Sequence, residues 1–313
     1  MMRVSVALCT YNGEKYIREQ LISIHNQTKL VNEIIVCDDC SDDRTIEIVK
    51  EVARKNDMPV RIFVNSVNHG CRRNFEKAIQ RCTGDLIFLS DQDDIWLPSK
   101  VKTIVSYFEQ HPEKNFVFTD AILINQYGAD CYNKTLFQVV GMDTRTQSLF
   151  DKGYTWEVLS IDCRVTGATC AFRASLLPYC LPLPYQLIHD EAIALASASQ
   201  GKIGYINQCL IKYRQHDKQA IGLSIPMSCP TRHWETTQNI MMKYLALIDQ
   251  FDQRTQKKLA FIYKRFWMIR LPWAFPRLCA AFLKGEYKSN YDKPRNVFLW
   301  DIKTRFVYLF HRI

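Results

Sequence analysis

Two hydrophobic patterns alternate along the first 110 residues of this chain. Short unbroken apolar runs are typical of strands buried on both faces. Such runs cover residues 4–9, 33–37, 60–64 and 86–89. Between them, apolar residues recur at helical spacing, as Ile17, Leu21 and Ile24 do,. The spacing predicts helices over residues 14–27, 42–54 and 75–82, and a further helix that begins at Pro98,. This alternation predicts an α/β fold with a mostly parallel sheet between helices.

The pattern is less regular from about residue 115 onward. It predicts strands over residues 116–119, 164–172, 203–206 and 210–214, and a helix over 189–199. Residues 125–160 are poorly patterned, which fits either a mobile substrate loop or a weak signal. Past residue 230 the chain is predicted to be helical, with breaks near Pro272 and Pro276,. We therefore expect one domain over residues 1–225 and a helical extension over 230–313.

The composition is that of a globular protein. The 313 residues are 47% hydrophobic and 23% charged, which argues against a disordered or fibrous chain,. No signal peptide and no apolar run of about 18 residues is apparent, so no spanning helix is expected,. The 12 cysteines include no CxxC pair, and we expect free thiols in a reducing, cytoplasmic location,.

The positive charge lies almost entirely in the C-terminal tail. Residues 255–313 hold 13 Lys and Arg against 3 Asp and Glu, whereas the whole chain has a net charge of +9. The same tail is rich in aromatic residues, including Trp267, Trp273 and Trp300. One interpretation is peripheral contact with an anionic membrane. The other, which is compatible with it, is a helical cap whose aromatics face the core. No recognisable nucleic-acid-binding module is present, and we expect no nucleic-acid partner.

Three polar clusters follow three of the predicted strands. They are Thr10-Tyr11-Asn12, Asp38-Asp39 and Asp91-Gln92-Asp93-Asp94. Parallel sheets bind ligands beyond the carboxyl ends of their strands, so the clusters should converge at one edge. Three carboxylates within four residues repel one another unless a cation lies among them. A divalent metal ion that carries a diphosphate is the usual occupant of such a position.

The chain resembles family 2 glycosyltransferases of the GT-A fold, within their bacterial rhamnosyltransferase-like branch. The resemblance rests on five segments that occur in the family's order and span roughly residues 3–222. They are residues 10–14 (TYNGE), 36–42 (VCDDCSD), 84–96 (GDLIFLSDQDDIW), 189–191 (HDE) and 213–216 (YRQH). The tail after residue 230 has no counterpart among these segments.

The resemblance implies a nucleotide site at the first two clusters. Asp39 would accept a hydrogen bond from the imide N–H of uracil or thymine, a task suited to a group that only accepts. Thr10, Tyr11 and Glu14 would line the base and ribose pocket, and Asp91 would contact the ribose. The alternative is ordinary turn and capping chemistry, which we favour for Asp38.

The resemblance also implies a divalent cation, Mg²⁺ or Mn²⁺, bound by Asp93 and by His216. Arg214 would hold the diphosphate. A lone His and Arg on a strand are more often structural, and that alternative stays open for both.

Acceptor contacts are expected from Asp94, Trp96 and the Thr166-Gly167 turn. Asp94 could instead hold its own loop, and Trp96 could equally be packed in the core.

Asp190 is the predicted general base, which takes the acceptor's hydroxyl proton as that oxygen attacks the anomeric carbon. Glu191 is adjacent and is the alternative base or an acceptor contact. Neighbouring residues on a helix point about 100° apart, so only one of them can face the site. A helix N-terminus that favours acidic residues through its dipole would explain both carboxylates without catalysis.

These inferences predict an inverting, metal-dependent glycosyltransferase. Its donor would be dTDP-rhamnose or a UDP-sugar, and its acceptor a lipid-linked or growing glycan of a bacterial surface polysaccharide (O-antigen or capsule). It would work at the inner face of the cell membrane. A catalytically inactive nucleotide-sugar-binding scaffold is the main alternative. A nucleotidyltransferase would need a Gly-rich basic loop after the first strand, and a receiver-like signalling domain would leave the later carboxylates without a role.

Overall fold

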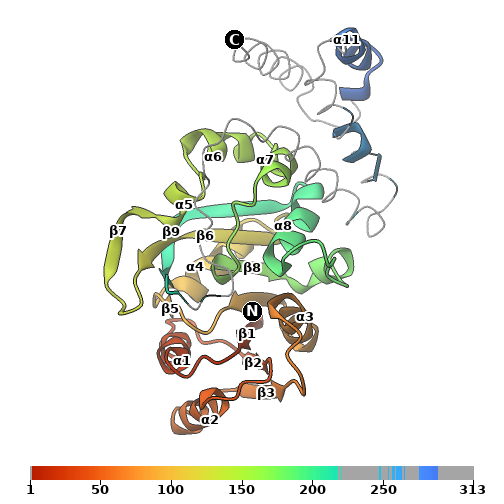
Figure 1. Ribbon diagram of the computed structural model, residues 1–313. Coiled ribbons are helices and arrows are strands. Elements are labelled where there is room, and N and C mark those ends of the chain that lie inside the picture. Colours follow the sequence, from red (N-terminus) through yellow and green to blue (C-terminus); the bar gives the residue numbers. More distant parts are fainter. Residues whose placement is uncertain are drawn as a thin grey trace. The chain divides into compact units, whose positions relative to one another are not determined.

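The computed structural model describes residues 2–217 and 219, residues 275–287, and isolated positions between 247 and 264. The chain forms two compact units, Met1–Leu247 and Ile248–Ile313, which we describe separately. The expected boundary between residues 225 and 230 lies outside the described residues. In the first unit, helices pack against a nine-stranded sheet (Figure 1).

The first half of this unit is the predicted alternation of strands and helices. The parallel strands are β1 (Val4–Thr10), β2 (Glu33–Asp38), β3 (Val60–Val64) and β4 (Leu86–Ser90), in the order β3-β2-β1-β4. The helices between them are α1 (Ile17–His25), α2 (Thr45–Lys55) and α3 (Cys71–Arg81). Every residue of β1, β2 and β4 is buried, which is why these strands appear in the sequence as apolar runs,.

The second half of the sheet mixes strand directions. Strand β8 (Cys170–Arg173) runs antiparallel between β4 and β6 (Phe116–Ile124). Strand β9 (Ile203–Arg214) is parallel to β6. Two further strands, β5 (Ile95–Trp96) and β7 (Asp130–Thr135), pair antiparallel with β9 and β6. The mixed α/β architecture expected from the sequence is confirmed.

Three expectations for this half are corrected. The two strands predicted over residues 203–214 are one continuous strand, because β6 pairs with β9 through register shifts around Asp120. The strand expected over 164–172 is only β8, preceded by the 3₁₀ turn η1 (Gly167–Thr169).

Residues 125–160 are structured rather than a simple loop. Besides β7, they form α5 (Leu136–Val139), α6 (Thr144–Asp151) and α7 (Thr155–Ile161). Local hydrogen bonds begin two of these helices: a capping box joins Thr135 and Gln138, and the Asp143 carboxylate accepts from the Thr146 amide,.

The core lies between the sheet and its helices, including α4 (Lys100–Gln110). Trp96 belongs to this core, is 2% exposed and packs near the ring of Phe88. Its burial rules out the expected acceptor contact in this conformation and supports the packing alternative. Helix α8 (His189–Ser199) is buried on nearly all sides, in keeping with its small, alanine-rich sequence.

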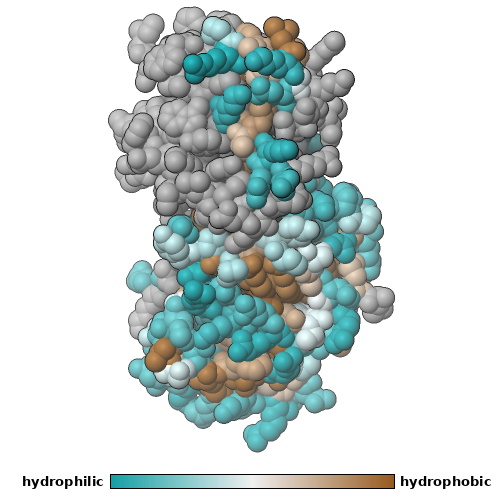
Figure 2. Space-filling view, turned by 90° about the vertical axis from the view of Figure 1, so that its right-hand side faces the viewer, coloured by the Kyte–Doolittle hydropathy of each residue, from teal (hydrophilic) through white to brown (hydrophobic). Residues whose placement is uncertain are grey.

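The described part of the second unit centres on α11 (Phe275–Leu283). Leu278 and Ala281 are buried, and the buried ring of Tyr287 contacts Phe261 and Phe282. Over the described surface in Figure 2, hydrophilic residues surround smaller apolar patches. Within the described residues, none of the helices has the length and apolarity needed to cross a bilayer. Ten cysteines whose side chains the structure describes are free thiols.

Candidate active site

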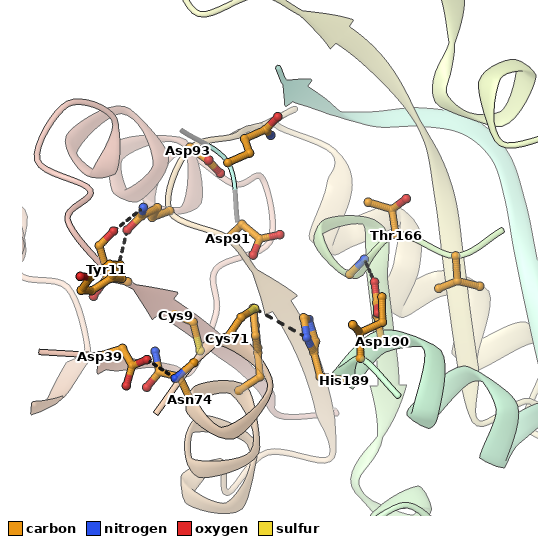
Figure 3. A pocket seen from close by; sticks show the side chains of 18 of the residues that line it. Cys9, Tyr11, Asp39, Cys71, Asn74, Asp91, Asp93, Thr166, His189 and Asp190 are labelled. Atoms are coloured by element: carbon orange, nitrogen blue, oxygen red, sulfur yellow. Dashed lines mark hydrogen bonds between the residues drawn. The ribbon is translucent and has the colours of Figure 1, made fainter. Parts of the chain in front are cut away.

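A cavity of about 530 Å³ opens beyond the carboxyl ends of β1, β2 and β4 (Figure 3). Six of the residues singled out in the sequence line it: Thr10, Tyr11, Asp39, Asp91, Asp93 and Asp190. The Thr166-Gly167 turn lines it as well. The parallel strands therefore bring the three polar clusters to one place, and α8 brings Asp190 to the opposite wall.

The Asp39 carboxylate is held by the loop that follows β3. One oxygen accepts from Asn65 Nδ2 at 2.8 Å and from the His69 amide at 2.9 Å, and the other accepts from the Gly70 amide at 2.7 Å. Gly70 has a φ of +81°, a conformation that glycine adopts at little cost,. The carboxylate is thus fixed in place and keeps lone pairs that could accept a further N–H.

The neighbouring Asp38 has a different task. Its carboxylate accepts from Thr10 Oγ1 at 2.7 Å and from Ser41 Oγ at 2.6 Å, and it is fully buried. It therefore ties the end of β1 to the turn that follows β2, which is turn chemistry and not a helix cap.

Gln92 joins the first and third polar clusters. Its side chain accepts from the Tyr11 amide at 2.9 Å and donates to the Tyr11 carbonyl at 3.0 Å. The Tyr11 ring itself is 49% exposed. Contacts between these loops fix their relative positions.

Glu14 departs from its expected role. Its carboxylate accepts from the Arg44 amide, directly before α2, at 3.2 Å, and Glu14 is not among the residues that line the cavity. A carboxylate near the first amides of a helix is stabilised by the helix dipole. In this conformation Glu14 fixes a turn rather than contacting a nucleotide.

The acid loop, residues 91–94, holds three carboxyl groups, and burial and proximity disfavour the charged forms of Asp91 and Asp94. Burial, followed by Asp93 and Asp190, raises the pKa of Asp91 to about 8. Burial, followed by Asp93 and Asp91, raises the pKa of Asp94 well above its usual value. Asp94 Oδ1 accepts from the Arg214 amide at 2.9 Å, whereas Oδ2 has no hydrogen-bond partner among the described residues. Asp94 is 1% exposed and holds its own loop, so the expected acceptor contact is not seen.

Asp93 and His216 meet although they are 123 residues apart in sequence. His216 Nε2 lies 2.8 Å from Asp93 Oδ2. A carboxylate oxygen and an imidazole nitrogen are ligands that Mn²⁺ and Mg²⁺ accept, and the uncompensated acid loop favours a cation here. No group of three His, Cys, Asp or Glu side chains in the described part of the chain could hold an ion by itself. The residues therefore fit a site to which a bound substrate must add ligands.

Arg214 supports this loop from behind. Its Nε donates to the Asp93 carbonyl at 2.7 Å, and one terminal nitrogen lies 2.6 Å from Glu19 Oε2. The guanidinium also lies over the Tyr16 ring, 4.7 Å from its centroid. Arg214 is 2% exposed and does not line the cavity, so its contacts are structural and the expected diphosphate contact is not available.

Lys100 is a buried cation that the sequence did not single out. Its Nζ donates to the Ala168 carbonyl at 2.6 Å and lies 4.0 Å from the centroid of the Trp96 ring. Burial lowers its pKa to about 7, although Asp94 and Asp91 oppose this shift. It is the first residue of an ordinary amphipathic helix, so no local signal marks it.

The wall opposite Asp39 carries Asp190. Its Oδ2 accepts from the Gly167 amide at 2.7 Å, and its Oδ1 accepts from the Glu191 amide at 2.8 Å. Asp190 lines the cavity and Glu191 does not. The 100° step between adjacent helical residues thus turns Asp190 toward the site.

Sequence reasoning missed two further parts of this cavity. One is the set of donors around Asp39, for which Asn68-His69-Gly70 offered only a turn signal,. The other is the pair Cys71 and His189, whose side chains approach to 3.9 Å at the cavity wall (Figure 3). They come from α3 and α8, and no sequence pattern links them.

Comparisons with known proteins find relatives of this chain. The model of the family described as Glycosyl transferase family 2 matches residues 5–162. TarS of Staphylococcus aureus, named poly(ribitol-phosphate) beta-N-acetylglucosaminyltransferase, is 33% identical over 133 residues, which cover 42% of this chain and 22% of TarS. An uncharacterized glycosyltransferase of Haemophilus influenzae is 38% identical over 108 residues, or 34% of this chain and 33% of that protein. The chain thus matches less than half the length of these two relatives.

Two solved structures share the fold over nearly the whole chain. TarS residues 1–349 in complex with UDP-GlcNAc superimposes with a TM-score of 0.57 at 16% identity, covering 99% of this chain and 92% of that one. The mannosyltransferase PcManGT of Pyrobaculum calidifontis, in complex with GDP-Man and Mn²⁺, gives a TM-score of 0.53 at 17% identity, with 100% and 88% coverage. At this level of identity the likeness establishes the fold.

Proposed function

Because this chain belongs to glycosyltransferase family 2, we propose that it transfers a sugar from a nucleoside diphosphate sugar to a hydroxyl group, with inversion at the anomeric carbon and with help from a divalent cation. The observation that supports this most is the shared cavity of Asp39, Asp91, Asp93 and Asp190. In one cavity, Asp39 could accept a hydrogen bond from a base N–H, the acid loop could bind a cation, and Asp190 offers a separate carboxylate.

The first wall would bind the nucleotide. The fixed Asp39 carboxylate would accept the imide N–H of uracil or thymine, and Thr10 and Tyr11 would border the same base. Asp91 lines the same cavity and lies between Asp93 and Cys71 in Figure 3, where a ribose hydroxyl could reach it.

Asp190 would act as the general base. As the acceptor oxygen attacks the anomeric carbon, its proton passes to the Asp190 carboxylate, and the bond from that carbon to the diphosphate breaks. The Gly167 and Glu191 amides hold the carboxylate in position and leave lone pairs on both oxygens.

Asp93 and His216 would hold the divalent cation, Mg²⁺ or Mn²⁺. A bound cation would neutralise the charge that develops on the departing diphosphate. The protein supplies the two ligand atoms and a loop in which burial and mutual repulsion raise the pKa values of Asp91 and Asp94.

For the substrates, we propose dTDP-rhamnose or a UDP-sugar as donor and a lipid-linked or growing surface glycan, such as O-antigen or capsule, as acceptor. The name of the relative TarS supports a bacterial surface polymer, and its structure with UDP-GlcNAc supports a uridine nucleotide. We also propose that the basic tail contacts an anionic membrane at its cytoplasmic face. Co-sedimentation of the full chain with phosphatidylglycerol vesicles tests this, and equal binding to neutral vesicles would contradict it.

The central experiment screens a panel of sugar nucleotides with Mn²⁺ or Mg²⁺, first by thermal shift and then by release of the nucleoside diphosphate. For Asp190→Asn we expect nucleotide binding to persist and turnover to fall by about 10³-fold. Glu191→Gln is the matched control and should keep its turnover. The reverse result would make Glu191 the base. If the wild type binds donors but never cleaves them, the chain is an inactive sugar-nucleotide scaffold.

A further inference from the structure

His189 is a cavity-lining histidine to which the proposed chemistry gives no role. It is the first residue of α8, lies between Cys71 and Asp190 in Figure 3, and is 5% exposed. Its ring stacks on Phe75, with centroids 3.8 Å apart and planes 14° apart. Its Nε2 is buried and has no hydrogen-bond partner among the described residues. A buried polar atom without a partner is costly, so a ligand atom is expected to satisfy it.

The Cys71 thiol contacts one nitrogen of the His189 ring and so bears on which of the two nitrogens carries the proton. Burial, together with Asp91 and Asp190, raises the pKa of this thiol, so it remains S–H. Its Sγ lies 3.9 Å from His189 Nδ1, and we assign the S–H as the donor of that contact because an imidazole nitrogen accepts more strongly than a thiol sulfur,. Nδ1 is then the acceptor, and the proton of the neutral ring is on Nε2. Burial lowers the pKa of His189, which keeps the ring neutral despite Asp190 nearby.

His189 Nε2 and the Asp190 carboxylate lie against the same residue of the cavity wall, Gly167. A Cβ atom placed on Gly167 would lie 2.9 Å from His189 Nε2 and 3.3 Å from Asp190 Oδ2. Both atoms therefore lie beside Gly167, which has no side chain to separate them. One is a neutral donor and the other an acceptor, which is the complement of a hydroxyl. A phosphate would instead meet the Asp190 carboxylate as a like charge.

We propose that His189 Nε2–H and Asp190 together hold one sugar hydroxyl, with His189 donating to its oxygen and Asp190 accepting its proton. This rests on the proposed function and adds a substrate-binding residue to it. The hydroxyl belongs either to the donor sugar or to the acceptor. In the second case it is the attacking hydroxyl, and His189 orients the oxygen that Asp190 deprotonates.

Two substitutions separate the N–H group from the ring. His189→Phe keeps a ring to stack on Phe75 and removes the donor, whereas His189→Gln retains a side-chain N–H. We expect His189→Phe to weaken binding of the donor or of the acceptor about tenfold, which is the effect of one lost hydrogen bond. His189→Gln should recover most of this loss. His111→Phe, at a half-exposed histidine after α4, is the control and should change nothing. If His189→Gln weakens substrate binding as much as His189→Phe does, the loss comes from packing and not from the N–H group. That result would overturn the proposal.

Whether His189→Phe changes donor binding or the KM for the acceptor shows which substrate carries the hydroxyl. A donor hydroxyl predicts that His189→Phe weakens binding of the sugar nucleotide but leaves UDP binding unchanged. An acceptor hydroxyl predicts normal sugar-nucleotide binding and normal donor hydrolysis, with a raised KM for the acceptor. Constants within twofold of wild type in both arms would overturn the proposal.

Nitrogen-15 NMR of His189 tests the contact even if no transfer is observed. The free protein should show the neutral Nε2–H tautomer at pH 7, and an Nδ1–H tautomer would overturn the proposal. Adding UDP-GlcNAc or dTDP-rhamnose should shift the Nε2 resonance and adding UDP should not, if the hydroxyl is on the donor. No shift with any sugar nucleotide or glycan acceptor would also overturn it. A wild type that cleaves no donor refutes the proposed function alone, because this signal does not depend on turnover.

Discussion

Asp39 and the acid loop differ in the hydrogen bonds and charges that the protein places around their carboxyl groups. Asp39 receives three hydrogen bonds from one loop, at 2.7 to 2.9 Å. In the acid loop, Asp94 has an oxygen without a partner among the described residues, and the pKa values of Asp91 and Asp94 are raised. The first group is complete in the free protein. The second needs a positive partner, so ligand binding should change it much more.

Asp93→Ala should have the largest effect on this contrast. We expect transfer to fall by about 10³-fold, because the departing diphosphate loses its counter-charge. UDP binding should lose its dependence on Mn²⁺ but keep the part that is seen without metal. Calorimetric titration of UDP with and without Mn²⁺ measures this. Asp42 is an exposed carboxylate on the loop after β2, so Asp42→Ala should leave the transfer rate and the Mn²⁺ dependence of UDP binding unchanged. If UDP binding still depends on Mn²⁺ in Asp93→Ala, Asp93 is not a metal ligand.

Asp39→Asn should show the opposite pattern. The amide offers one acceptor oxygen where the carboxylate offers two, so both the loop contacts and the base contact weaken. We expect UDP to bind about 10- to 100-fold more weakly, and equally so with and without Mn²⁺. The same titration measures it. A loss confined to the Mn²⁺ condition would mean that the two ends of the cavity are not independent.

Arg214→Lys tests whether the protein scaffold holds the acid loop open for a cation. Lysine keeps the charge but lacks the planar fork that reaches both the Asp93 carbonyl and Glu19,. We expect a stability loss of about 1–2 kcal/mol in urea unfolding and weaker Mn²⁺ binding. UDP affinity without metal should stay the same, and an unchanged Mn²⁺ affinity would show that the loop does not depend on this support.

The smallest effect concerns pH. The folded pKa of Asp91 is raised to about 8 from an ordinary 3.8, so this group stabilises the metal-free protein fully below about pH 4,. That contribution is lost as the pH rises through about 8. We therefore expect Asp91→Asn to flatten the decline in unfolding free energy between pH 5 and 9, measured by urea titration. Bound Mn²⁺ should reduce the same decline in the wild type, and a decline unaffected by either change would contradict this account.

Much of the fold was predictable because its signals are local. Fully buried parallel strands such as β1 and β4 must be apolar throughout, and the helices between them show regular spacing,. The short elements of residues 125–160 were missed because helices of 4 to 8 residues leave little periodicity. The two-residue strand β5 is too short to show a pattern at all, and it exists only because β9 lies beside it.

The sequence by itself determined that polar clusters follow β1, β2 and β4, and parallel strand ends meet at one edge wherever such a sheet forms. It also pointed to Asp190 and to the pairing of Asp93 with His216. Only the tertiary structure decided which side chains face the cavity.

In the tertiary structure Arg214 and Trp96 are buried and support the fold. His189 contacts Cys71, 118 residues away in sequence. The physical reason is that side-chain direction depends on packing between distant elements. A motif fixes only the chain position of its residues.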